Sequence, residues 1–159
     1  MSSLKSDRLN HWLTLGANLG VLVGIILLIM ELDQNREMMR AQVRHDIASQ
    51  TIDELRALAS DAVLTNIIIR QNSGEELSEA EELQARTHRY AAFRTWENLN
   101  FQYRLGLFDE EEYRAHTEGW VRLINGPNYY ATYWCDYRDF ASPGFKAEMD
   151  SLINDSKCQ

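Results

Sequence analysis

One uninterrupted apolar segment constrains this sequence more than any other feature. No residue between Trp12 and Met30 is charged, although charged residues make up 25% of the chain. A helix over these residues is about 28 Å long at ~1.5 Å per residue, close to the roughly 30 Å of a bilayer's hydrocarbon core. Trp12 lies at one edge, where interfacial tryptophans are common. The segment therefore predicts a transmembrane helix over about residues 12–30.

Two other structures also place an apolar segment near an N-terminus. A secretory signal peptide has a shorter apolar region, roughly 7–15 residues, with small residues at its cleavage site. Here the segment is followed by MELDQNREMMR, which is bulky and charged. The second alternative is a buried helix of a soluble protein, but such a helix is seldom apolar on every face. A membrane span accounts best for the pattern.

Glycine recurs at every fourth position within the segment, at Gly16, Gly20 and Gly24. In membranes, small residues four apart let two helix backbones approach closely, as in the GxxxG motif. The three glycines form two overlapping copies of this motif. They predict a helix–helix interface and therefore a homo-oligomer. The alternative is that they reflect only the general abundance of glycine in membrane helices.

The opposite face of the helix carries polar groups. At about 100° per residue, Asn18 lies about 160–200° from the glycines, and Thr14 shares its face. An amide in hydrocarbon needs a hydrogen-bond partner, so two faces of the helix favour protein contact. A cyclic homo-oligomer uses both faces, whereas a simple dimer needs one. Alternatively, Asn18 bonds within its own chain or to interfacial water.

A cyclic assembly leaves open a second function, an oligomeric pore or cation channel. If the Asn18 face of each helix lined a central axis, the pore would have rings of polar side chains, a constriction of apolar side chains and a ring of carboxylates at its mouth. The side chains that this alternative places along the pathway are those of Thr14, Asn18, Ile25, Ile29, Glu31 and Asp33.

The rest of the sequence predicts helices alone. No glycine or proline occurs between Gly24 and Gly74, so the membrane helix can continue without a break. We expect an all-α fold, with an N-terminal tail and transmembrane helix over residues 1–32 continuing into a soluble helical bundle over 33–159. The predicted later helix starts are Ser60, the capping box Ser78–Glu81, Asp109 and Ser142-Pro143.

Little in the sequence supports catalysis, and we expect neither a cofactor nor a metal. The net charge of −8 and the lack of a basic stripe argue against nucleic acid as a partner. The four histidines match no zinc or di-iron spacing, and no phosphate-binding loop or nucleophile elbow occurs. Acidic clusters at 74–82 and 109–113 lie at predicted helix starts, where carboxylates offset the helix dipole. We expect a non-enzymatic scaffold or interaction module.

An aromatic cluster near the C-terminus supports one further alternative. Tyr130, Trp134 and Tyr137 follow helical spacing, which predicts packing in the core. Tyrosine and tryptophan are also enriched in ligand pockets and protein interfaces. A ligand sensor or enzyme that uses these three aromatic residues therefore stays open.

Three motifs carry a family resemblance. They are Glu31-Leu-Asp-Gln34-Asn35 after the span, FQYRLGLFDEEEY over 101–113, and Trp134 ahead of Phe140-Ala-Ser-Pro-Gly-Phe145. Together they resemble a widespread group of bacterial single-span membrane proteins with a helical C-terminal domain. The resemblance covers most of the chain and implies a bacterial membrane protein. We expect its location to be the inner membrane, which the chain crosses once. Because that group has no assigned activity, it implies no functional residue.

Two sequence features bear on the side of the membrane on which the C-terminal domain lies. Basic residues on the two flanks nearly balance under the positive-inside rule. The cysteines, Cys135 and Cys158, match no metal spacing, and we expect them to be unpaired. Unpaired cysteines fit a reducing compartment, which favours a cytoplasmic C-terminal domain.

Overall fold

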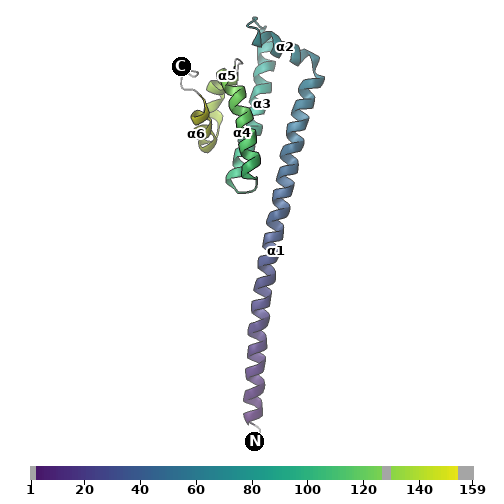
Figure 1. Ribbon diagram of the computed structural model, residues 1–159, viewed down its shortest axis with the longest axis vertical. Helices are drawn as coiled ribbons and strands as arrows, with labels where there is room; N and C mark the ends of the chain where they lie inside the picture. The colour runs from purple at the N-terminus through teal and green to yellow at the C-terminus, as the bar shows by residue number, and fades with distance from the viewer. Residues whose placement is uncertain (1–2, 127–129, 154–159) are drawn as a thin grey trace. The chain divides into compact units, whose positions relative to one another are not determined.

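The computed structural model describes residues 3–126 and 130–153, and within these ranges it contains α-helices, one short 3₁₀ helix and no strand (Figure 1). The predicted all-α fold is confirmed. The elements are α1 (Ser3–Ser60), α2 (Ala62–Asn72), α3 (Glu79–Arg104), α4 (Glu110–Asn125), α5 (Tyr130–Tyr137), the 3₁₀ helix η1 (Arg138–Phe140) and α6 (Pro143–Leu152).

The chain divides into two compact units, residues 1–41 and 42–159. The division falls within α1, after Ala41. The predicted boundary between the membrane part and the soluble bundle, after residue 32, stays a prediction. Helix α1 itself runs without interruption to Ser60, as the absence of glycine and proline predicted.

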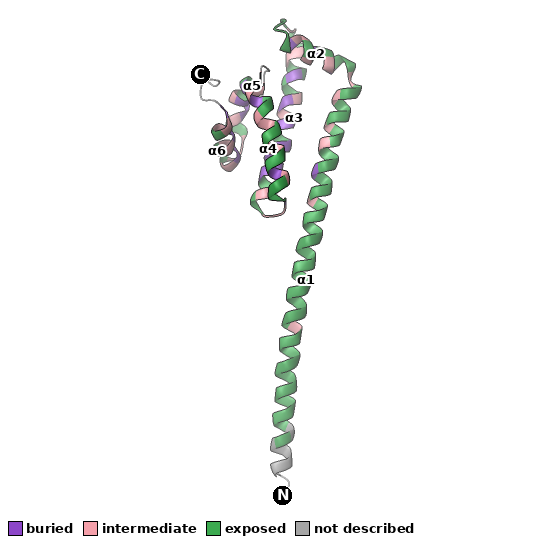
Figure 2. Ribbon diagram, in the orientation of Figure 1, coloured by how far each residue is buried: buried purple, intermediate pink, exposed green. Residues whose placement is uncertain are grey.

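The first unit is a helix with almost no buried surface. The apolar part of α1 is long and apolar enough to cross a membrane, and none of its most apolar window is buried. Figure 2 shows this part of α1 exposed along nearly all of its described length. Leu19, Val21 and Leu27 are each about 60% exposed. A core helix of a soluble protein would instead be mostly buried.

Helix α3 is the centre of the second unit, where it packs against α2, α4, α5 and α6 (Figure 1). The core around it is mainly aromatic. The ring of Phe93 stacks on Tyr137 at a centroid distance of 5.3 Å and meets Trp134 edge-on at 5.6 Å. Trp96 stacks on Trp120 at 4.8 Å. Each such ring pair stabilises the fold by roughly 0.5–1.5 kcal/mol beyond the effect of burying apolar surface.

The acidic clusters start helices, as the sequence predicted. Ser78 caps α3 in a capping box: its backbone N–H donates to Glu81 Oε2 at 2.9 Å, and its Oγ accepts from the Glu81 N–H. The hydrogen bond from the Ser78 backbone N–H, followed by those from Arg70 and from the Ser78 hydroxyl, lowers the pKa of Glu81 to about 2. Asp109 caps α4, because its Oδ1 accepts hydrogen bonds from the backbone N–H groups of Glu111 and Glu112.

One predicted helix start is wrong by a residue. The N-cap of α2 is Asp61, whose Oδ1 accepts from the Leu64 N–H at 2.9 Å, rather than Ser60. Ser60 is the last residue of α1, and its hydroxyl donates to the carbonyl of Ala57. Asp61 takes the cap because its backbone is extended and its carboxylate reaches the free N–H groups of the next turn.

Candidate functional site

The glycine face of α1 is open. An added Cβ at Gly16, Gly20 or Gly24 would meet no atom within 4 Å apart from neighbouring and helix-backbone atoms. No described residue of the same chain therefore uses the close approach that these glycines allow. A helix that packs on these glycines would have to come from another molecule, and such an interface stays a prediction.

The polar groups on the opposite face differ in their hydrogen bonding. The Thr14 hydroxyl donates to the Asn10 carbonyl at 2.8 Å, so it is satisfied within its own helix. Asn18 is exposed, and among the described residues nothing bonds to its amide. If this part of α1 crosses a membrane, as the sequence predicts, the Asn18 amide would need a partner outside the described residues. The other residues of the predicted pore face are also exposed, namely Ile25, Ile29, Glu31 and Asp33.

The three C-terminal aromatic residues lie in different surroundings. Trp134 is 0% exposed and Tyr137 is 4% exposed, so both pack in the core. Tyr130 is half-buried and lines a cavity. Tyr130 is thus the one of the three that a ligand in this cavity can reach.

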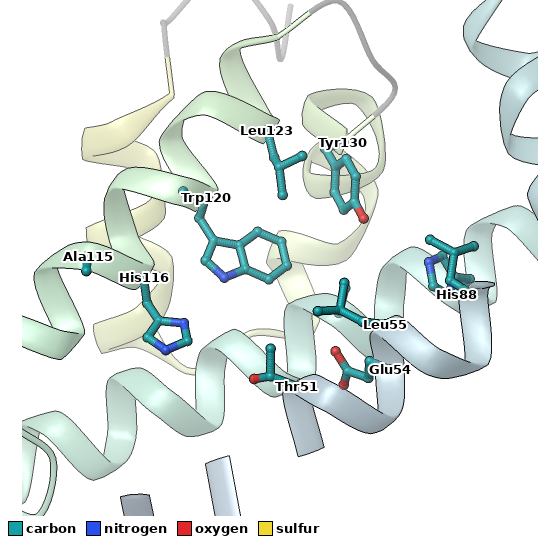
Figure 3. A pocket seen from close by; sticks show the side chains of 12 residues that line it. Thr51, Glu54, Leu55, His88, Ala115, His116, Trp120, Leu123 and Tyr130 are labelled. Carbon is teal, nitrogen blue, oxygen red and sulfur yellow. The ribbon is translucent and has the colours of Figure 1, made fainter. Parts of the chain in front are cut away.

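The cavity has a volume of about 340 Å³ and is partly open to solvent. Its walls come from the last turns of α1, from α3, from α4 and from the start of α5 (Figure 3). Leu55, Leu58, Leu123 and Trp120 make most of the lining apolar. The lining groups that can form hydrogen bonds or carry charge belong to Thr51, Glu54, His88, His116, Trp120 and Tyr130.

Glu54 is the acidic side chain that lines this cavity. The Thr95 hydroxyl donates to Glu54 Oε1 and in turn accepts from Gln50 Nε2 at 3.1 Å. Within residues 3–126 and 130–153, no lysine or arginine forms an ion pair with Glu54, and none lines the cavity. Burial, together with the nearby Arg89, lowers the pKa of His88, which favours its neutral form.

A buried arginine beside the cavity belongs to a structural network. Arg89 is 1% exposed, and its Nη1 donates to Gln71 Oε1 at 2.8 Å. Its guanidinium lies over the rings of Tyr130 and Tyr133 at 5.2 and 5.1 Å. Tyr133 donates to Glu82, and burial together with this carboxylate raises the pKa of Tyr133 to about 12. The network joins α2, α3 and α5.

A second buried network joins α3, α4 and α6. Asn100 Nδ2 donates to the Tyr113 hydroxyl at 2.9 Å, and Tyr113 donates to Glu148. Burial, with this carboxylate, raises the pKa of Tyr113 well above its ordinary value. Both networks hold helices together. In the part of the chain that the structure describes, no three histidine, cysteine or acidic side chains are grouped to hold a metal.

The structure contradicts the prediction that both cysteines are unpaired. Cys135 in α5 is disulfide-bonded. Cys158, the other cysteine of the sequence, lies outside the described residues. The expectation of unpaired cysteines is therefore wrong for Cys135. The argument for a cytoplasmic C-terminal domain, which depended on it, no longer holds.

Comparisons with known proteins add no identification. No family model, curated protein or solved structure matches this chain. The resemblance to bacterial single-span membrane proteins therefore stays a prediction from three sequence motifs.

Proposed function

We propose that this protein is a non-enzymatic, single-pass protein of the bacterial inner membrane that self-assembles through its transmembrane helix. Its C-terminal helical unit then serves as a scaffold or interaction module. One observation supports this most strongly: the apolar segment of α1 is unburied, with an open glycine face. An apolar surface of this extent needs lipid or protein to cover it.

Lipid and a second helix cover different parts of this surface. Moving one exposed leucine, isoleucine or valine side chain out of water stabilises the inserted state by roughly 1.5–3 kcal/mol. The segment offers many, such as Leu19 and Leu27, so insertion is strongly favoured. Lipid gives no comparable preference for a flat glycine face, where a second backbone packs closely instead.

The Asn18 amide favours a ring over a simple pair of helices. It has no partner among the described residues and lies opposite the glycines. In a cyclic homo-oligomer, one helix can present its glycine face to one neighbour and the Asn18 face to another or to the axis. An interhelical hydrogen bond of this kind contributes roughly 0.6–2 kcal/mol.

The full chain tests this proposal directly. We expect it to sediment with membranes, to resist carbonate extraction, and to appear as a single closed oligomer in native mass spectrometry from detergent. Intact chain in the soluble fraction, or a monomer alone at micromolar concentration, would contradict the proposal. The pore alternative predicts in addition cation-selective currents in planar bilayers, which a closed bundle does not give.

The disulfide suggests the side on which the C-terminal unit lies. Disulfides persist in oxidising compartments and are rare in the cytosol. Because Cys135 is disulfide-bonded, we place this unit on the oxidising side of the membrane. We expect a C-terminal alkaline phosphatase fusion, which is active only where disulfides form, to be active in cells. Activity solely from a reporter that folds in the cytoplasm would contradict this orientation.

A further inference from the structure

We propose that the cavity of the second unit binds a small hydrophobic amine. Glu54 holds the charged nitrogen, and the apolar body of the ligand lies against Trp120 and Tyr130. This proposal does not depend on the membrane assembly, because every lining residue belongs to the second unit.

The cavity has the size and lining of a ligand site. Its volume of about 340 Å³ lies within the roughly 300–1,000 Å³ of small-molecule sites, which are mostly apolar with a few placed polar groups. In Figure 3, Thr51, Glu54 and Leu55 lie on one side of the cavity, and Trp120 and Tyr130 face them. A ligand can therefore touch the carboxylate and an aromatic ring at once.

The charge in the cavity selects a cation. The Glu54 carboxylate has one hydrogen bond, from Thr95, and no basic partner among the described residues. A carboxylate in mostly apolar surroundings gains from pairing with a cation that also fills the apolar space. Arg89 does not serve as that cation, because it is bound to Gln71 and is not part of the lining.

The aromatic wall is held in place before any ligand arrives. The Trp120 indole is stacked on Trp96, which is buried in the core, with the two planes 9° apart. The ring of Tyr130 meets Trp120 nearly at a right angle, at a centroid distance of 5.9 Å. Tryptophan is the strongest cation–π partner among side chains, so an amine beside it is favoured over a neutral analogue.

Three probes of matching shape test the charge preference: 2-phenylethylamine, the neutral 2-phenylethanol and the anionic 3-phenylpropanoate. The full chain in a non-ionic detergent is titrated with each, and binding is followed by ligand-observed NMR. For the amine we expect a dissociation constant on the order of 1 mM. The alcohol and the carboxylate are expected to bind about tenfold more weakly or worse.

Two variants place the binding in this cavity. Glu54→Gln keeps an oxygen for Thr95 and removes the charge, so the preference for the amine over the alcohol should disappear. Asp53→Asn makes the same change in charge on the next residue, which does not line this cavity, and should leave the preference intact. Gly119 lines the cavity and has open space at its missing Cβ, so Gly119→Leu should fill the cavity and abolish binding of all three probes.

Four outcomes would overturn the proposal. The wild-type chain could bind amine and alcohol equally, or show no amine binding at concentrations well above 1 mM. The preference for the amine could persist undiminished in Glu54→Gln, or amine binding could survive Gly119→Leu. A chain that is monomeric yet binds the amine would contradict the proposed assembly and leave this site standing.

Discussion

Replacing Gly20 by isoleucine is expected to break the oligomer apart. Gly20 is the middle glycine of the face, and open space surrounds its missing side chain within the chain itself. A branched side chain here would hold two backbones apart, so the closest contact of the interface would be lost. We expect association to weaken at least about tenfold, equivalent to ~1.4 kcal/mol. Native mass spectrometry of the detergent-solubilised chain across a dilution series measures this.

Leu22→Ile is the matched control. It lies about 160° from Gly20 around the helix, and it exchanges one branched apolar side chain for another. The oligomer should keep its size in this variant. If both variants dissociate to the same extent, or neither does, the glycines do not form the interface.

The largest loss of folding stability is expected from Phe93→Ala in the second unit. Phe93 is 0% exposed, and its ring contacts those of Trp120, Tyr130, Trp134 and Tyr137. Truncation would leave a cavity that these rigid rings cannot fill, at a cost of about 3–5 kcal/mol in free energy of unfolding. Guanidinium denaturation followed by tryptophan fluorescence measures the change.

Phe101→Ala provides the control on the same helix. Its side chain is 49% exposed, so little packing is lost and the cost should be much smaller. Equal destabilisation by the two variants would contradict the central place that the structure gives Phe93.

The parts of this fold that depend on local chemistry could be predicted from the sequence. Ser78 and Glu81 are three residues apart and satisfy each other's N–H groups, so the start of α3 needed no tertiary information. The uninterrupted α1 and the apolar span likewise follow from composition along one segment. Asp61 and Ser60 are both good N-caps, and the choice between them depended on where the backbone turns.

The parts that depend on packing could not be predicted. The cavity draws its walls from four helices, and nothing in the sequence places Glu54 opposite Trp120. Helical spacing grouped Tyr130 with Trp134, yet Tyr130 lines the cavity, whereas Trp134 is wholly buried against Phe93 of α3 and Phe145 of α6. The disulfide bond of Cys135 is likewise indicated by no spacing in the sequence.

Cysteine cross-linking in native membranes tests the central claim most directly: that the glycine face of the membrane helix is where chains meet. On a background with Cys135→Ser and Cys158→Ser, Leu27→Cys places a thiol about 20° from Gly20 around the helix, and Ile25→Cys places one about 20° from Asn18 at a similar depth. In a ring, the glycine face of one chain meets the Asn18 face of the next. Oxidation should therefore link chains that carry both cysteines into covalent multimers and leave the Leu27→Cys single variant largely monomeric. Equal cross-linking of the single and double variants, or none of the double variant in membranes that hold the assembled protein, would contradict the account.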